Sequence, residues 1–199
     1  NLKRSVLFVG FDAEEKGLLG SKHFIESSPV KIENITTMIN MDMIGRMSDS
    51  SYTVGGVGTS PSFEYLLDSL KKGRPFNLVM NKPGFGPSDH ATFYTKDIPV
   101  LFFFSGVHDE YHTPADTWQL INLRGEKHIL DYIYDLTYCL SRAPKRPVFQ
   151  EAGPKKGQMG APKKFTVTFG IMPSYSSTEK GLEVDGISKS DGPAAKAGM

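Results

Sequence analysis

The stretch "SVLFVGFDAEEKGLLGS", residues 5–21, contains the two features that decide the fold. Its first half is an unbroken apolar run at residues 5–11, which is typical of a strand buried on both faces of a parallel sheet. Two adjacent glutamates, Glu14 and Glu15, follow almost at once. Such a pair indicates either a helix N-terminus, where acidic side chains favour the helix dipole, or a functional site.

Strand patterns and helix patterns alternate through the following 130 or so residues. Continuous or alternating apolar runs predict strands at 6–11, 35–41, 51–56, 76–80 and 98–106. Apolar positions at helical spacing predict helices at 16–26, 61–72, 89–94 and 123–142, with Ser88 and Asn122 expected to cap the last two. This alternation predicts an α/β fold, a three-layer sandwich with a mostly parallel central sheet.

The composition changes after residue 142. Residues 143–164 are rich in Pro, Gly and Lys and predict a linker. Beyond it, "KFTVTFGIMP" and "GLEVDGIS" predict two strands of a separate module. We therefore expect three regions, 1–142, 143–164 and 165–199. Both ends look cut, because a buried strand seldom opens a domain so close to a terminus, and we expect a longer protein.

Overall composition excludes several classes of function. Hydrophobic residues make up 39% and charged residues 23%, with a net charge of +1, so charge implies neither nucleic acid nor an anionic membrane surface. No apolar stretch reaches the ~18 residues of a transmembrane segment. The single cysteine, Cys139, excludes an internal disulfide and a cysteine-based zinc site.

Polar side chains follow three of the predicted strands. Glu14 and Glu15 follow the first, Asp42 follows the strand at 35–41, and His112 follows the strand at 98–106. Ligands of parallel sheets bind beyond the carboxyl ends of the strands, so these residues should converge. Carboxylates and an imidazole suit a divalent cation, zinc above all, with one glutamate free to act as general base. A turn role for Asp42 and a loop role for His112 remain open alternatives.

Four motifs then point to a known family. "FVGFDAEEKGLLGSKHF", "INMDMIGR", "PSDHATF" and "YHTPADT", in this order, resemble the zinc exopeptidases of metallopeptidase family 28. That family includes bacterial aminopeptidases, glutamate carboxypeptidases and glutaminyl cyclases. The resemblance implies that Glu14 is the general base, that Glu15, Asp42 and His112 bind zinc, with Asp42 on a different ion, and that Tyr111 hydrogen-bonds the developing oxyanion.

The chain also departs from the family pattern. Members of this type bind two zinc ions through five residues, and the other two, a His and a bridging Asp, lie upstream of the "EE" pair. With three of the five ligands, this chain alone is expected to bind zinc weakly and to have little or no activity. Asp89, His90 and Asp116 are expected to support the ligands. Ser88, Asp89 and His90 are adjacent in sequence and so cannot easily form a serine triad.

The resemblance thus implies a co-catalytic zinc aminopeptidase, in which a metal-bound hydroxide attacks the peptide substrate and Glu14 acts as general base. Two alternatives stay open, a glutaminyl cyclase-like zinc transferase and a non-catalytic interaction module. Residues 165–199 resemble the first part of a bacterial PDZ domain, which implies a peptide ligand. Relatives joined to such modules are usually exported, so the resemblance also implies the periplasm or the extracellular space.

Overall fold

The computed structural model describes residues 2–48, 50–155, 169–173, 184–187 and 190–198. The chain divides into two compact units, Asn1–Gly157 and Gln158–Met199. The first unit therefore runs past the boundary expected at residue 142.

A four-stranded sheet forms the centre of the first unit. Its strands are β1 (Met38–Met41), β2 (Ser51–Gly55), β3 (Asn77–Met80) and β4 (Val100–Phe104), in the order β1-β4-β2-β3. β1 is parallel to β4 and β2 is parallel to β3, but β2 is antiparallel to β4. The sheet is thus mixed rather than mostly parallel. The connection at 42–50 explains this difference, because it is too short for the crossover that parallel strands require.

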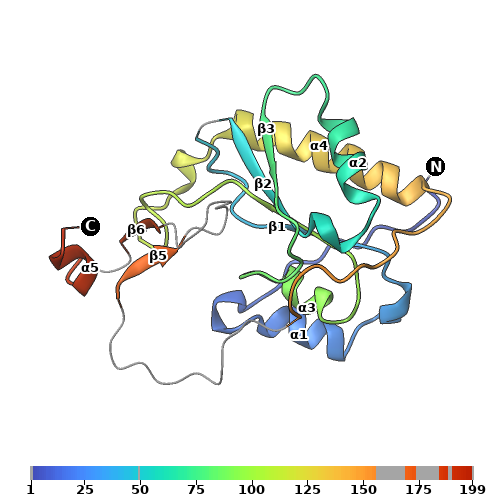
Figure 1. Cartoon of the computed structure of the whole chain (residues 1–199), viewed down its shortest axis with the longest axis horizontal. Helices are drawn as coiled ribbons and strands as arrows, with labels where there is room; N and C mark the ends of the chain where they lie inside the picture. The colour runs from blue at the N-terminus through green and yellow to red at the C-terminus, as the bar shows by residue number, and fades with distance from the viewer. Residues whose placement is uncertain (1, 49, 156–168, 174–183, 188–189, 199) are drawn as a thin grey trace. The chain divides into compact units, whose positions relative to one another are not determined.

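Helices cover both faces of this sheet (Figure 1). α2 (Phe63–Lys71) and α4 (Leu123–Arg142) pack on one face, while α1 (Leu19–Glu26) and α3 (His90–Tyr94) pack on the other. Short 3-10 turns occur at Glu14–Lys16 (η1), Ile32–Asn34 (η2), Val57–Thr59 (η3) and Trp118–Leu120 (η4). The α/β prediction, with helices on both sides of the sheet, is confirmed.

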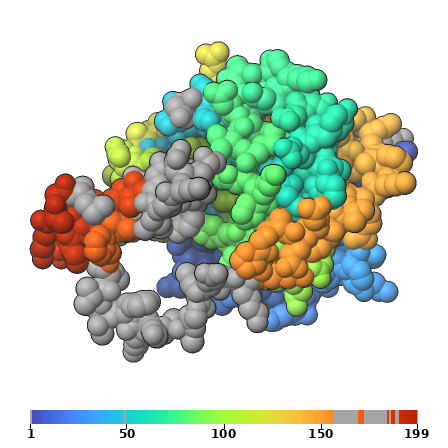
Figure 2. Space-filling model, viewed as in Figure 1, coloured from blue at the N-terminus to red at the C-terminus, as the bar shows by residue number. Residues whose placement is uncertain are grey.

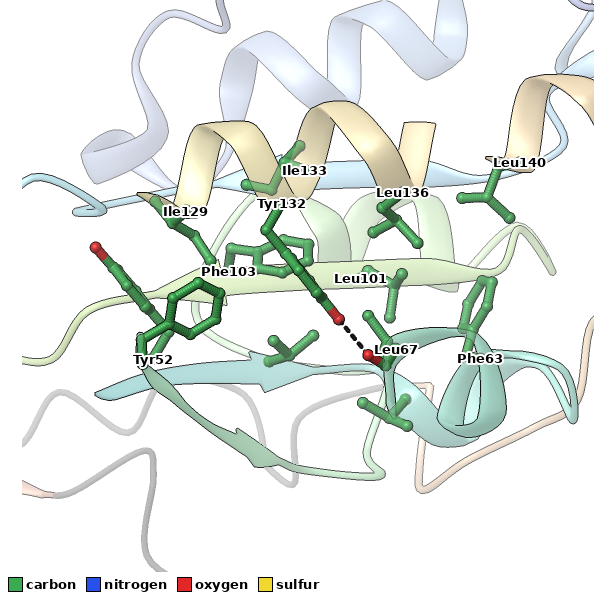
Figure 3. Close-up of a cluster of buried hydrophobic side chains, with 13 residues drawn as sticks. Tyr52, Phe63, Leu67, Leu101, Phe103, Ile129, Tyr132, Ile133, Leu136 and Leu140 are labelled. Carbon is green, nitrogen blue, oxygen red and sulfur yellow. Dashed lines mark hydrogen bonds between the residues drawn. The ribbon is translucent and has the colours of Figure 1, made fainter. Parts of the chain in front are cut away.

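The larger core lies between the sheet and the α2 and α4 helices (Figure 3). Tyr132 lies at its centre, where its hydroxyl donates a 2.8 Å hydrogen bond to the carbonyl of Leu67. Its buried side chains are Tyr52, Val54, Val57, Phe63, Leu67, Phe76, Leu101, Phe103, Ile129, Tyr132, Ile133, Leu136 and Leu140. A smaller core on the other face includes Met38, Phe93, Tyr94, Ile98 and Val100.

The α4 helix has the bounds that its sequence predicts. Asn122 caps it, because its Oδ1 atom accepts a 2.9 Å hydrogen bond from the Gly125 amide. The predicted capping role of Ser88 on α3 is wrong. The Ser88 hydroxyl donates instead to the carboxylate of Asp42, 2.8 Å away.

The predicted strand at residues 6–11 does not form. Leu7, Phe8 and Val9 are exposed, Phe8 to 86%. Only the end of the run is anchored in the core, where the Phe11 ring packs 5.8 Å from that of Phe24. A strand buried on both faces needs hydrogen-bonded neighbours, and no described residue pairs with this segment in a sheet.

The segment that follows α4 packs against the rest of the first unit. The Gln150 amide donates to the Thr59 carbonyl at 2.9 Å, and the Ala152 amide donates to the Tyr94 hydroxyl at 2.8 Å. Lys155 forms a 2.5 Å ion pair with Asp97. Figure 2 shows this segment, in orange, lying along the surface of the unit. The first part of the predicted linker is therefore packed structure.

The second unit contains a two-stranded antiparallel sheet, β5 (Ile171–Pro173) and β6 (Val184–Ile187), followed by the short helix α5 (Pro193–Lys196). Most of the strand predicted at 164–173 lies outside the described residues. In the described part of the chain, no helix combines the length and the apolarity that a bilayer span requires.

Candidate active site

The glutamate pair forms a tight turn before α1. Glu14 and Glu15 begin the η1 turn, and Gly17, at φ +100°, ends it. The Asp12 carboxylate accepts a 2.7 Å hydrogen bond from the Ala13 amide, which fixes the entry to this turn. Both glutamates therefore lie outside the α1 helix, which begins at Leu19.

Asp42 lies at the carboxyl end of β1. Its amide donates to the Phe103 carbonyl on β4 at 3.1 Å, so the ends of the two parallel strands meet here. The Ser88 hydroxyl donates to Asp42 Oδ2 at 2.8 Å and accepts from Asn40 Nδ2 at 2.7 Å. Because Asn40 and Ser88 are both buried, this chain of hydrogen bonds fixes the orientation of the Asp42 carboxylate.

His112 meets the glutamate pair directly. Its Nε2 atom lies 2.9 Å from Oε1 of Glu15, although the two residues are 97 positions apart. Both side chains are largely exposed. The imidazole stacks on the Tyr111 ring, with the two ring centres 3.8 Å apart. The structure therefore gathers Tyr111, His112 and Glu15 into one cluster at the surface.

Three non-glycine residues at or beside the predicted site have a left-handed backbone. They are Ala13 at φ +54°, Met43 at φ +52° and His112 itself at φ +57°. Each such conformation costs about 1–3 kcal/mol and persists only where surrounding contacts enforce it. Strain of this kind concentrates at functional sites, which agrees with the position of these residues beside Glu14 and Asp42.

The Glu14 carboxyl lies within electrostatic reach of three other acidic side chains of the site. Burial and, to a smaller extent, the neighbouring carboxylates of Glu15, Asp42 and Asp89 together raise its pKa to about 7, while His112 opposes them. Negative charge is therefore concentrated at this edge of the sheet.

Asp89 and His90 are buried beside this site. Burial raises the pKa of Asp89, and its Oδ1 atom has no hydrogen-bond partner among the described residues. The His90 ring stacks on Phe102 at 4.4 Å, and burial lowers its pKa to about 3, so it is neutral. His90 thus packs against Phe102 of β4.

Asp116 binds an arginine that the sequence analysis missed. Arg46 Nη1 lies 2.5 Å from Asp116 Oδ1, and Arg46 Nη2 lies 2.5 Å from Glu110 Oε2. His108 contacts the same two carboxylates. Arg46 directly follows the "NMDMIG" motif in the sequence. Because arginine is not a metal ligand, a search for metal ligands alone does not find it.

The donor chemistry of this edge suits zinc, although a complete ligand set is not assembled. In the described parts of the chain, no three His, Cys, Asp or Glu side chains lie close enough to hold one ion. Glu15 and His112 touch, while Asp42 is held separately by Ser88. An imidazole and carboxylates are common zinc ligands, and a cation would relieve the repulsion between Glu14 and the carboxylates around it.

The model of peptidase family M28 matches residues 1–137. This chain belongs to peptidase family M28. The M28 chain is 25% identical over 154 residues to the aminopeptidase YwaD of Bacillus subtilis, and this match covers 72% of the chain and 34% of YwaD. The chain therefore spans about a third of that relative's length.

Solved structures agree with this assignment. The LapA aminopeptidase of Legionella pneumophila matches the M28 chain with a TM-score of 0.60 and 26% identity, over 73% of the chain and 41% of LapA. BSAP, a zinc aminopeptidase of Bacillus subtilis, matches with a TM-score of 0.57 and 23% identity, over 72% of the chain and 38% of BSAP. The second match shows a shared fold.

Proposed function

We propose that this chain carries the carboxyl-terminal part of the catalytic domain of a zinc aminopeptidase, which removes N-terminal residues from peptides. The observation that carries the proposal is the 2.9 Å contact between His112 Nε2 and Glu15 Oε1. An imidazole and a carboxylate that face each other at the surface supply two of the ligands that a zinc ion takes. Membership of the M28 family and similarity to YwaD and LapA support the same function.

In this proposal Glu15 and His112 would ligate one zinc ion and Asp42 would ligate a second. A His and an Asp from sequence outside residues 1–199 would complete the ligand set. Bound zinc would acidify a water molecule and polarise the carbonyl group of the scissile peptide bond. The chain alone would bind zinc weakly, because in the described residues no three ligand side chains lie close enough to hold one ion.

Glu14 would move the proton during hydrolysis. It would take the proton from the attacking water as general base and deliver it to the leaving amine as general acid. Its place in the η1 turn, next to Glu15 and within electrostatic reach of His112, supports this role.

Tyr111 would stabilise the developing oxyanion by donating a hydrogen bond. Its ring stacks on His112 at 3.8 Å, so the phenol belongs to the same cluster. One such donor is worth about 10²–10³ in kcat. The acidic side chains around the ions would hold the free α-amine of the peptide, which makes the enzyme an exopeptidase.

We further propose that residues 165–199 form the first part of a PDZ domain, which would bind an extended peptide by strand addition. The antiparallel pairing of β5 and β6 is compatible with such a module. Export to the periplasm or the extracellular space belongs to the same proposal.

The test uses the intact protein, meaning residues 1–199 together with the sequence that supplies the missing His and Asp. Its activity is assayed on an amino-acid p-nitroanilide and on a peptide that begins with Gln. We expect hydrolysis of the anilide. Glu14→Gln should keep the zinc content of the wild type and lower kcat about 10²–10⁴-fold, whereas Glu64→Gln, at an exposed glutamate of α2, should match the wild type. Cyclisation without anilide hydrolysis would identify a transferase, and zinc binding without either reaction would identify a non-catalytic module.

A further inference from the structure

His112 sits on a loop whose own backbone holds it only locally. The Tyr111 amide donates to the His108 carbonyl, the Thr113 amide to Glu110 and the Asp116 amide to Thr113, at 3.0–3.1 Å. These are turn bonds within residues 108–116, and they do not attach the loop to the sheet. The strained φ of His112 therefore needs support from elsewhere.

Arg46 supplies that support on both sides of His112. Its Nη2 atom binds Glu110, two residues before His112, and its Nη1 atom binds Asp116, four residues after it, both at 2.5 Å. A guanidinium presents several N–H donors in a fixed plane, so a single side chain closes both ends of the loop at once. The Arg46 side chain is only 15% exposed, and its ion pair with Glu110 holds the pKa of that carboxyl below its usual range.

The backbone of Arg46 is itself fixed to the end of the sheet. Its amide donates to the Ser105 hydroxyl at 3.3 Å, directly after β4, and the same hydroxyl donates to the Met43 carbonyl. The neighbouring Gly45 carbonyl accepts a 2.8 Å hydrogen bond from the Asn122 amide, at the start of α4. Arg46 thus extends from a fixed point on the same short segment that carries Asp42.

We propose that Arg46 is a positioning residue that holds the loop at 108–116 so that His112 meets Glu15 and Tyr111 stays stacked beside it. This role rests on the proposed function. Arg46 connects the segment after β1, which carries Asp42, to the segment after β4, which carries His112. Arg46 acts through Glu110 and Asp116 and has no contact with the reacting atoms.

The test compares Arg46→Met, Arg46→Lys and Arg74→Met in the intact protein. Arg74 is a matched control, because it is 19% exposed and forms a 2.5 Å ion pair with Asp135, away from the proposed site. Zinc affinity is measured by competition with a chromophoric chelator, and kcat and KM are measured on an amino-acid p-nitroanilide. Hydrogen–deuterium exchange of the loop amides is measured in metal-free protein.

We expect Arg46→Met to weaken zinc binding about 10–100-fold and to lower kcat more than it raises KM. Its amides at 108–116 should exchange faster than those of the wild type. Arg46→Lys should recover part of the affinity, because an ammonium can pair with one carboxylate but lacks the planar fork. Arg74→Met should leave zinc affinity, kcat and loop exchange at wild-type values.

Two results would overturn the role of Arg46. One is wild-type zinc affinity and loop exchange in Arg46→Met, and the other is an equal loss in Arg74→Met, which would indicate general destabilisation. If Arg46→Met fails to fold, Asp116→Ala removes one arm of the same contact and should reproduce the weaker zinc binding. A wild type that neither binds zinc nor hydrolyses the anilide would sink the proposed function, while the exchange rates would still decide whether Arg46 holds the loop.

Discussion

Protonation of His90 should destabilise the folded protein in mild acid. Burial lowers the pKa of this imidazole to about 3, whereas an unfolded chain binds a proton near pH 6.5. Below pH 6.5 the unfolded state therefore binds more protons than the folded state, and stability falls with the pH until about pH 3. The slope approaches about 1.4 kcal/mol per pH unit, so His90 alone should cost about 2 kcal/mol between pH 7 and pH 5.

The assay is urea unfolding followed by circular dichroism at pH 7, 6 and 5, for the intact wild type and for His90→Gln. The variant lacks the titrating ring, so its free energy of unfolding should fall by about 2 kcal/mol less over this range. The neighbouring Asp89 is present in both proteins, and its contribution should largely cancel in the comparison. His23→Gln, at an exposed histidine of α1, is the control and should keep the wild-type slope. Equal slopes for the wild type and His90→Gln would refute the claim that His90 is buried and neutral.

Two further predictions concern the core and the support of Asp42. Leu136→Ala should lower the free energy of unfolding by about 2–5 kcal/mol, because Leu136 is fully buried in the larger core. Leu130 lies on the same helix but is 42% exposed, so Leu130→Ala should change the free energy of unfolding by about 0.5 kcal/mol or less; equal losses would contradict the described orientation of α4. Ser88→Ala should weaken zinc binding about 10–100-fold by releasing the Asp42 carboxylate, and unchanged affinity would show that this hydrogen bond does not orient a ligand.

Local patterns predicted most of the helices and strands of the first unit. The α4 helix has its predicted bounds because its apolar spacing, its Asn122 cap and its burial all agree. The prediction at residues 6–11 was wrong because an apolar run specifies burial without specifying which strands will pair with it. The antiparallel direction of β2 depends on how a short connection crosses the sheet, which apolar periodicity does not report.

The motifs predicted a set of candidate site residues, but the sequence does not predict their contacts. Glu15 and His112 were two of the candidate ligands, and the structure brings them to 2.9 Å. Nothing in the sequence pairs Arg46 with Glu110 and Asp116, because ion pairs between distant loops depend on tertiary packing. Ser88 had a good local explanation as a helix cap, but its hydroxyl donates instead to the carboxylate of Asp42, which is distant in the sequence.

The most direct test of the proposed zinc site is the zinc content of the intact protein and of its His112→Gln variant. The account predicts two ions per polypeptide in the wild type, and loss of the ion shared by Glu15 and His112 in the variant. Asp42→Asn should lose the other ion instead. Retention of the full zinc content after substitution of His112 would contradict the account.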